Sequence, residues 1–185
     1  MTAYQLAAFG LLTIVLVVIS RKSLRSPRSH GFYRFFAWEF IAALAILNLG
    51  VWFKTPWAWH QILSWLLLCL GLLPLVLGIH ALKSRGKPQA QRSGEPQLLG
   101  FEKTSQLVDS GIYAVIRHPL YTSLLMLTWG IFFKQPGWPG FLLALAASAC
   151  LFATARADEV ECLRYFGEAY ARYMQRTRRF IPYLF

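Results

Sequence analysis

The sequence lacks several features that mark common enzyme classes. It has eight acidic residues against 19 lysines and arginines, and three cysteines in 185 residues. Cys69 and Cys150 fall inside apolar runs and Cys162 in a polar stretch, so they form neither a disulfide framework nor a metal-ligand spacing. A glycine-rich phosphate loop, a Gly-x-Gly-x-x-Gly motif and a serine nucleophile elbow are also missing. These absences argue against P-loop, Rossmann-type and serine-hydrolase enzymes, and we expect three free thiols and no metal site.

Apolar residues dominate the chain instead. They make up 56% of it, aromatic residues make up 16%, and the apolar residues come in long blocks. Soluble domains have a lower apolar fraction. The net charge of +11 at pH 7 is compatible with nucleic-acid binding, but the basic side chains flank the apolar blocks, which is the usual mark of cytoplasmic loops. We therefore expect a multi-pass membrane protein with no nucleic-acid partner.

The apolar blocks predict an all-α fold, a polytopic membrane helix bundle with five transmembrane helices plus a C-terminal amphipathic helix. The five spans cover residues 4–20, 31–53, 61–82, 119–133 and 140–155. A long polar loop at 83–110 separates the third span from the fourth, and a turn signal makes spans four and five a helical hairpin. The C-terminal helix, residues 156–176, repeats apolar residues at three- and four-residue steps. We treat residues 1–185 as one domain.

The basic residues also predict the orientation of the bundle. Arg21 and Lys22 follow the first apolar run and do not precede it, so we expect this run to stay as a signal anchor. Lys54 and Lys134 are the only lysines or arginines in the two turns on the opposite side. The positive-inside rule then places the N-terminus outside and the C-terminus in the cytoplasm.

An Arg-His-Pro sequence stands where the fourth apolar helix begins. Pro119 fits the first turn of a helix because its missing N–H is one that stays unpaired there anyway. Arg117 and His118 then sit beside unpaired N–H groups and the positive end of the helix dipole, where an anionic ligand group binds well. Tyr113 and Tyr121 supply aromatic faces and hydroxyls to the same rim. We interpret this turn as the binding centre; the alternative is a snorkelling arginine with a polar interfacial histidine.

A second set of ionisable residues follows the fifth span. Arg156, Asp158 and Glu159 lie at its cytoplasmic end, and the helical hairpin brings them towards the Arg-His-Pro turn. Asp158 and Glu159 come directly after an apolar run, where carboxylates are costly without a partner, and Glu159 can pair with Arg156 on one helical face. Glu161 and Glu168 fit a solvated helix face.

Three further polar residues fall inside the predicted spans, namely Glu39, Asn48 and His80. An ionisable residue within a span is by default a functional hypothesis. Glu39 and Asn48 fit hydrogen bonding between helices equally well. Their roles stay open at this point.

The polar segments carry a recognisable pattern. It comprises Leu107-Val108-x-x-Gly111-Ile112-Tyr113-x-x-x-Arg117-His118-Pro119-x-Tyr121, then Asp158-Glu159, then Phe166-Gly167-x-x-Tyr170-x-x-Tyr173 and Pro182. This pattern resembles the isoprenylcysteine carboxyl methyltransferase family and the related phospholipid methyltransferases, over about residues 98–185. The first three spans carry no motif that matches. Asp158 departs from the family's usual Glu-Glu pair, and the short chain is more similar to small prokaryotic members, which implies a prokaryotic inner membrane.

The resemblance implies an integral membrane enzyme that transfers a methyl group from S-adenosylmethionine (SAM) to a lipophilic or lipid acceptor among the membrane lipids. It implies a cofactor site enclosed between the Arg-His-Pro turn and the C-terminal helix, and it puts Arg156 and Glu159 at the interface between acceptor and cofactor as catalytic residues. The resemblance and the charge argument together give the cofactor-binding set: Leu107, Val108, Gly111, Tyr113, Arg117, His118, Pro119, Tyr121 and Asp158.

These residue types suit SAM, which carries a carboxylate, an ammonium group and a sulfonium. A carboxylate or thiolate acceptor needs no general base, whereas an amine acceptor does, and Glu159 is then the candidate. Two alternatives remain. One is a sterol-type membrane reductase that binds NADPH through Lys83, Arg85, Lys87 and Arg92, and the other is a non-enzymatic lipid-binding subunit. The residues from Asp158 to Tyr173 favour the methyltransferase.

Overall fold

The computed structural model describes residues 2–87, 102 and 104–182, so most of the loop expected at 83–110 lies outside the described residues. The helices of this part of the chain are α1 (Ala3–Leu24), α2 (His30–Leu47), η1 (Leu49–Val51), α3 (Trp59–Arg85), η3 (Gly111–Ala114), α4 (Pro119–Phe132), α5 (Trp138–Phe166) and α6 (Glu168–Arg176). The prediction of an all-α bundle is confirmed for these residues, which form no strand; Ile116 and Arg178 make an isolated parallel bridge.

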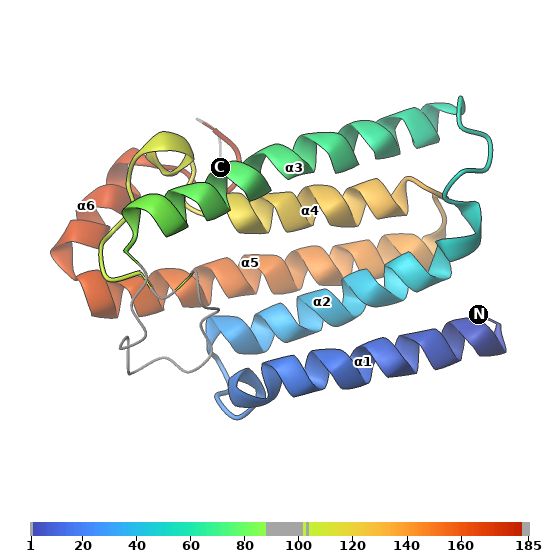
Figure 1. Cartoon of the computed structure of the whole chain (residues 1–185), viewed down its shortest axis with the longest axis horizontal. Helices are drawn as coiled ribbons and strands as arrows, with labels where there is room; N and C mark the ends of the chain where they lie inside the picture. Colours follow the sequence, from blue (N-terminus) through green and yellow to red (C-terminus); the bar gives the residue numbers. More distant parts are fainter. Residues whose placement is uncertain (1, 88–101, 103, 183–185) are drawn as a thin grey trace.

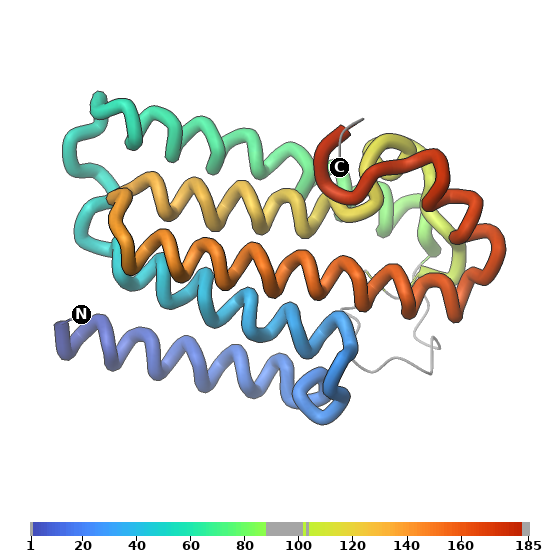
Figure 2. Tube along the Cα trace, turned by 180° about the vertical axis from the view of Figure 1, so that it is seen from behind, coloured from blue at the N-terminus to red at the C-terminus, as the bar shows by residue number. Residues whose placement is uncertain are grey.

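The long helices lie side by side along one direction (Figures 1 and 2). α2 packs on α5, α3 on α4, and α4 on α5, while α1 lies on the outer side of α2. The contact of α2, α4 and α5 holds a fully buried core around Leu44, Ile131, Ala144 and Ala147. Small residues on α5 allow this close approach. The result is a core nearer to the end of the bundle where α4 turns into α5.

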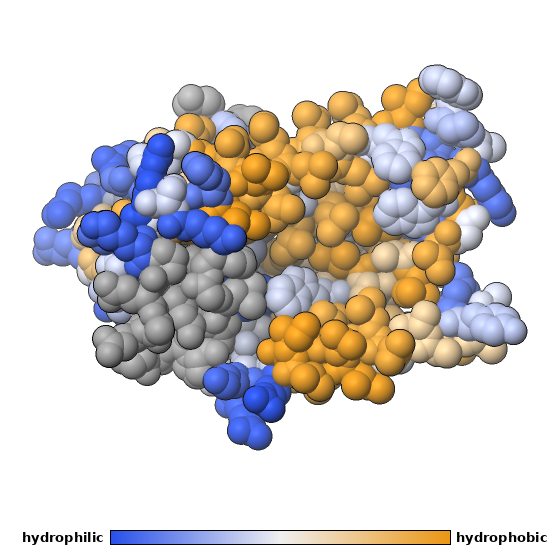
Figure 3. Space-filling view, viewed as in Figure 1, coloured by the Kyte–Doolittle hydropathy of each residue, from blue (hydrophilic) through white to orange (hydrophobic). Residues whose placement is uncertain are grey.

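The expectation of five membrane spans is not confirmed. Among the described residues, α1, α3 and α5 are long and apolar enough to cross a membrane. α4 has 14 residues, which is about 21 Å of helix against a hydrocarbon core of about 30 Å. α2 carries His30, Arg34 and Glu39 in its first ten positions, which lowers its hydropathy. Figure 3 shows apolar side chains over the middle of the helices and polar ones gathered towards the ends.

Several boundaries differ from the expected ones. The fifth helix does not end at residue 155: α5 continues to Phe166, because the sequence has no helix breaker before Gly167, where the backbone turns with φ 58°. The separate C-terminal helix is therefore only α6, not 156–176. The second helix ends at Leu47 and not near residue 53, since the Asn48 side chain turns back to donate to the Ile131 carbonyl at 3.0 Å.

Candidate functional site

The Arg-His-Pro turn begins α4 as the sequence predicts, with His118 as N-cap residue and Pro119 in the first turn. Its backbone, however, is paired with the C-terminal segment that follows α6. The Arg117 N–H donates to the Arg178 carbonyl at 2.7 Å, and the His118 N–H donates to the Arg179 carbonyl at 3.1 Å. These two N–H groups are therefore not free for an anion. The C-terminal segment instead acts as a strap across the start of α4.

The acidic pair at the end of the apolar part of α5 reaches this turn, and Glu159 is its buried member. Glu159 is 4% exposed and accepts hydrogen bonds from Arg117 Nε at 2.9 Å and from Arg179 Nη2 at 2.8 Å. His118 Nε2 lies 3.4 Å from the same carboxylate. Three cationic groups stabilise the ionised form of Glu159, which makes it a poor proton acceptor. This geometry favours a positioning role for Glu159, which ties α5, the Arg-His-Pro turn and the strap together.

Asp158 is the member of the pair that faces open space. Its side chain is 23% exposed and lines a cavity. It lies 3.6 Å from His118 Nδ1 and accepts a hydrogen bond from the Tyr121 hydroxyl at 3.2 Å. The two carboxylates, adjacent in sequence, thus differ in how many further hydrogen bonds they can accept. Asp158 keeps acceptor capacity for a ligand, whereas Glu159 has little.

His118 lies between the two carboxylates and stacks on the Tyr121 ring at 5.3 Å between centroids. Burial by itself would lower the pKa of His118, but the hydrogen bonds to Asp158 and Glu159 raise it above its ordinary value. The imidazole is therefore held as a cation more firmly than a free histidine. This buried cation offsets the charge of the acidic pair.

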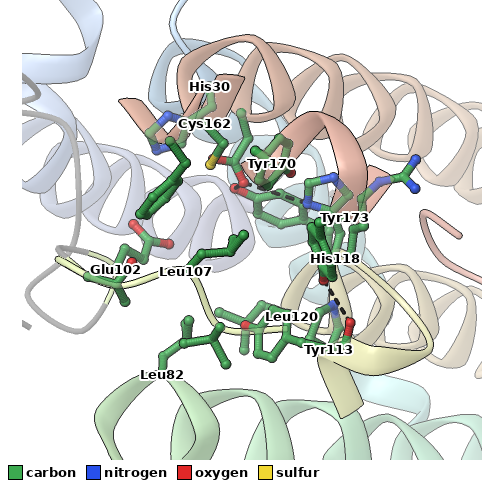
Figure 4. Close-up of a pocket in the computed structure, with 17 residues that line it drawn as sticks. His30, Leu82, Glu102, Leu107, Tyr113, His118, Leu120, Cys162, Tyr170 and Tyr173 are labelled. Carbon is green, nitrogen blue, oxygen red and sulfur yellow. Dashed lines mark hydrogen bonds and ion pairs between the residues drawn. The ribbon is translucent and has the colours of Figure 1, made fainter. Parts of the chain in front are cut away.

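The cavity beside these groups contains about 710 Å³ of space between atoms, part of which is open to solvent. It opens at the end of the bundle where α3, α4, α5 and α6 meet the η3 segment (Figure 4). It is lined by His30, Leu82, Glu102, Thr104, Leu107, Val108, Tyr113, Arg117, His118, Pro119, Leu120, Tyr121, Asp158, Cys162, Phe166, Tyr170 and Tyr173. Aromatic and apolar walls thus surround a few charged groups.

A layer of tyrosines forms one wall. The Tyr173 hydroxyl donates to the Tyr113 carbonyl at 2.8 Å, which fastens α6 to η3. Tyr170 and Tyr173 pack with their ring centroids 5.5 Å apart. Burial raises the pKa of Tyr113 well above its ordinary value, so its hydroxyl stays neutral. The wall therefore presents uncharged aromatic faces.

The opposite wall comes from residues that the sequence did not assign to the site. His30 begins α2 and is hydrogen-bonded to Glu161, whose side chain is 12% exposed and so does not belong to a solvated face as expected. Arg34, one turn further along α2, binds the Glu102 carboxylate at 2.7 and 2.9 Å. In the sequence, the one sign of these site residues was the set of polar residues at the start of α2. Hydrophobic periodicity alone could not show that this set packs against α5.

Eight of the eleven predicted site residues line the cavity: Leu107, Val108, Tyr113, Arg117, His118, Pro119, Tyr121 and Asp158. Gly111, Arg156 and Glu159 do not. Gly111 opens η3 with φ 66°, a conformation that favours glycine, and Arg156 is exposed on α5. The ligand roles of all eleven stay predictions.

Other expected ligand groups lie elsewhere. Glu39 accepts a hydrogen bond from Thr13 of α1 at 2.8 Å, and His80 is exposed on α3. Among the basic residues proposed for NADPH, Lys83, Arg85 and Lys87 are not in the cavity wall, and Arg92 lies outside the described residues. The described part of the site therefore shows no basic cluster for a 2′-phosphate.

A sequence model of the phospholipid methyltransferase family matches residues 59–169, which is more than half of the chain. The chain belongs to the phospholipid methyltransferase family. No curated protein and no solved structure matches it. The family match confirms the predicted resemblance and extends it to α3, where the sequence had shown no motif. It ends just before Tyr170, so the last part of α6 and the strap lie beyond it.

This phospholipid methyltransferase family member is a membrane protein, with three apolar helices of spanning length among the described residues. The family match includes α3, α4 and α5, and therefore the Arg-His-Pro turn, the acidic pair and most of the cavity wall. Family membership supports a methyltransferase that acts on lipid-like substrates. His30, at the start of α2, lies outside the matched residues.

Proposed function

We propose that this protein transfers a methyl group from SAM to a lipophilic acceptor, with both bound in the cavity beside the Arg-His-Pro turn. The observation that carries this proposal is that Asp158 and Arg117, both within the family match, meet the tyrosine wall in one cavity. When bound, SAM supplies an electrophilic methyl group on a sulfonium. The protein's task is then alignment of the two reactants and exclusion of water.

The residues present fit the charges of SAM. The Asp158 carboxylate suits the ammonium group, and the faces of Tyr113 and Tyr121 suit the sulfonium. The hydrogen bonds of Arg117 use Nε and Nη1, and no hydrogen bond from Nη2 is found within the described residues. The first-turn N–H groups of α4 at Leu120 and Tyr121 are likewise without a partner there. These donors suit the carboxylate of the ligand.

The acceptor is expected to enter from the bilayer. The cavity is at the end of the bundle where the apolar part of α5 gives way to polar residues, and the basic loop between α1 and α2 lies at the same end (Figure 1). Arg21 and Lys22 in the last turn of α1, together with Arg25 and Arg28 in the loop, mark this end as cytoplasmic under the positive-inside rule. We therefore infer that the site is on the cytoplasmic side, at the depth of lipid headgroups.

A methyl-transfer screen tests the proposal. The purified protein is placed in nanodiscs of mixed lipids with SAM carrying an isotopically labelled methyl group, and the lipids are analysed by mass spectrometry. We expect at least one lipid class to gain the label, and Asp158→Asn to reduce the gain. A complete absence of labelled lipid, with SAM unconsumed, would contradict the proposal.

A further inference from the structure

His30 is a buried histidine in the cavity wall with one nitrogen unsatisfied. The residue is 1% exposed and begins α2. Its Nδ1 lies 2.5 Å from Glu161 Oε2, and its backbone N–H donates to Glu161 Oε1 at 2.9 Å. Its Nε2 is buried and finds no hydrogen-bond partner among the described residues. A buried nitrogen without a hydrogen-bond partner destabilises the folded protein. A ligand bound in the cavity that His30 lines could supply this partner.

The contact with Glu161 determines which form of the ring faces the cavity. A carboxylate beside Nδ1 accepts a hydrogen bond from the Nδ1–H group, so the proton of the neutral ring stays on Nδ1 and the lone pair is on Nε2. The same arrangement of carboxylate and histidine orients the base in hydrolytic enzymes. Figure 4 shows His30 on a different side of the cavity from His118 and Tyr113, the residues assigned to the methyl donor. His30 therefore lies apart from His118 and Tyr113, while the charge of Asp158, proposed to hold the ammonium group of SAM, still acts on it.

We propose that His30 is the general base that removes a proton from an amine acceptor. This inference rests on the proposed methyl transfer and deepens it. An alkylammonium group has no lone pair, so it first gives a proton to His30 Nε2. The neutral amine then forms the new C–N bond while the C–S bond of the sulfonium breaks with its electron pair on sulfur, and His30 releases its proton to solvent. Glu159 cannot take this role easily because Arg117, His118 and Arg179 already occupy its carboxylate.

The surroundings of His30 make its ring a stronger base than that of a free histidine. Its charged neighbours are Glu161 and Asp158 on α5 and Arg34 on α2, the last paired with Glu102. Burial would lower the pKa of His30, but the hydrogen bond to Glu161 and the charges of Asp158 and Glu161 raise it above its ordinary value despite Arg34. Because only the neutral ring accepts a proton, methylation should increase as pH rises through this pKa.

A binding experiment without SAM gives the first test. The chain has four histidines, so selective 15N-histidine labelling gives few NMR signals, and the His30 signals are those missing from His30→Gln. We expect the His30 Nε2 signal to move when lysophosphatidylethanolamine, which has a primary amine, is added. Lysophosphatidylglycerol, which has none, should leave the signal unchanged. Equal responses to both lipids, or none to either, would overturn the assignment.

A kinetic experiment gives the second test, with phosphatidylethanolamine in nanodiscs as the amine probe. Loss of a general base typically costs about 10²–10⁴-fold in rate, so we expect His30→Gln to fall by at least about 100-fold. Its affinity for S-adenosylhomocysteine should fall far less than the rate, because the hydrogen bonds of His30 are to Glu161 and not to the residues proposed to hold SAM. His80→Gln, which alters an exposed histidine on α3, is the matched control and should keep the wild-type rate. An unchanged rate in His30→Gln would overturn the proposal.

A third variant decides the matter if His30→Gln does not fold. Glu161→Gln keeps the shape of the partner but removes its charge, which lowers the pKa of His30. The rising part of the pH–rate profile should then move to lower pH, whereas a purely structural contact predicts no movement and would overturn the proposal. Failure of the methyltransferase proposal is recognised separately, since the wild-type chain would then neither bind S-adenosylhomocysteine nor label any lipid.

Discussion

The two ends of the helix bundle both bury polar side chains, but they use them differently. At the end opposite the cavity, Gln61 donates to the carbonyls of Val51 and Lys134, both at 3.0 Å, and accepts from Lys134 Nζ at 3.2 Å. Lys134 Nζ also lies 3.6 Å from the centroid of the Trp65 ring. At the cavity end, the Asp158 side chain is 23% exposed and lines the cavity, and His30 Nε2 is buried without a hydrogen-bond partner among the described residues. In the first network the polar side chains pair with one another and with neighbouring turns. In the second, polar atoms remain that can form hydrogen bonds with a ligand.

This difference teaches that a buried polar residue in a membrane bundle is not by itself a sign of function. Asn48 and Lys134 are as buried as His118, yet their polar atoms serve neighbouring turns and rings. The distinguishing features of the cavity end are the cavity itself and, in its wall, polar atoms that can still form hydrogen bonds. Variants at the two ends should therefore separate effects on stability from effects on binding.

The largest effect on stability is expected from Glu159→Ala. This change leaves Arg117, His118 and Arg179 without their shared carboxylate in a nearly buried position, and breaking such a cluster costs about 3–5 kcal/mol. Chemical denaturation in detergent micelles measures the free energy of unfolding. Glu159→Gln is the matched control and should lose less, because the amide still accepts hydrogen bonds. A loss below about 1 kcal/mol in the alanine variant would show that the cluster does not hold the strap.

Asp158→Asn should affect binding more than stability. Removing the charge that faces the ligand's ammonium group costs about 1.5–3 kcal/mol, which corresponds to roughly a 10- to 100-fold loss of affinity. Calorimetric titration with S-adenosylhomocysteine measures this loss, and the melting temperature of the free protein checks the fold. Wild-type affinity in Asp158→Asn would remove this carboxylate from the binding site.

The pH dependence of stability should also reflect the cavity end. His118 has a folded-state pKa raised above the ordinary value of about 6.5, and His30 is raised in the same direction. The contribution of the two histidines to the free energy of unfolding is complete at pH values below their pKa in the unfolded chain. It is lost as pH rises through their raised pKa in the folded protein, so stability should fall with pH over that window. Denaturation of the wild type and of His118→Gln at several pH values tests this, with a shallower slope expected in the variant. Parallel slopes would contradict it.

Ser64→Ala, in the closed network, should have the smallest effect. The Ser64 hydroxyl donates to the Gly130 carbonyl at 2.6 Å and joins α3 to α4. Loss of one such hydrogen bond costs about 1 kcal/mol of stability. The affinity for S-adenosylhomocysteine should stay within twofold in the same titration. A larger loss of affinity would mean that the two ends are coupled.

Much of the cavity end could be predicted from the sequence. Pro119 fixed the start of α4, and the helical hairpin required the Arg-His-Pro turn and the acidic pair to meet. The sequence could not show that the Arg117 and Glu159 side chains pair directly, because this depends on the strap, which approaches from 60 residues away in the chain. For the same reason the sequence could not show that the N–H groups of Arg117 and His118 themselves are bonded to the strap.

The contribution of α2 to the cavity could not be predicted from the sequence for a different reason. His30 and Glu161 are separated by 131 residues, and their contact arises from the packing of α2 along the whole of α5. That packing in turn depends on α5 continuing past residue 155. The change from apolar to polar residues at this point led to the wrong prediction that the helix ends there. A break in hydropathy marks where a helix leaves an apolar environment, and it does not mark where the helix ends.

The central claim is that the cavity beside the Arg-His-Pro turn binds SAM, and calorimetric titration of the purified wild-type chain with S-adenosylhomocysteine tests it most directly. The account predicts saturable binding of one ligand per chain, with no comparable heat from NADPH. The absence of heat from S-adenosylhomocysteine at saturating concentration, in a sample shown to be folded, would contradict it.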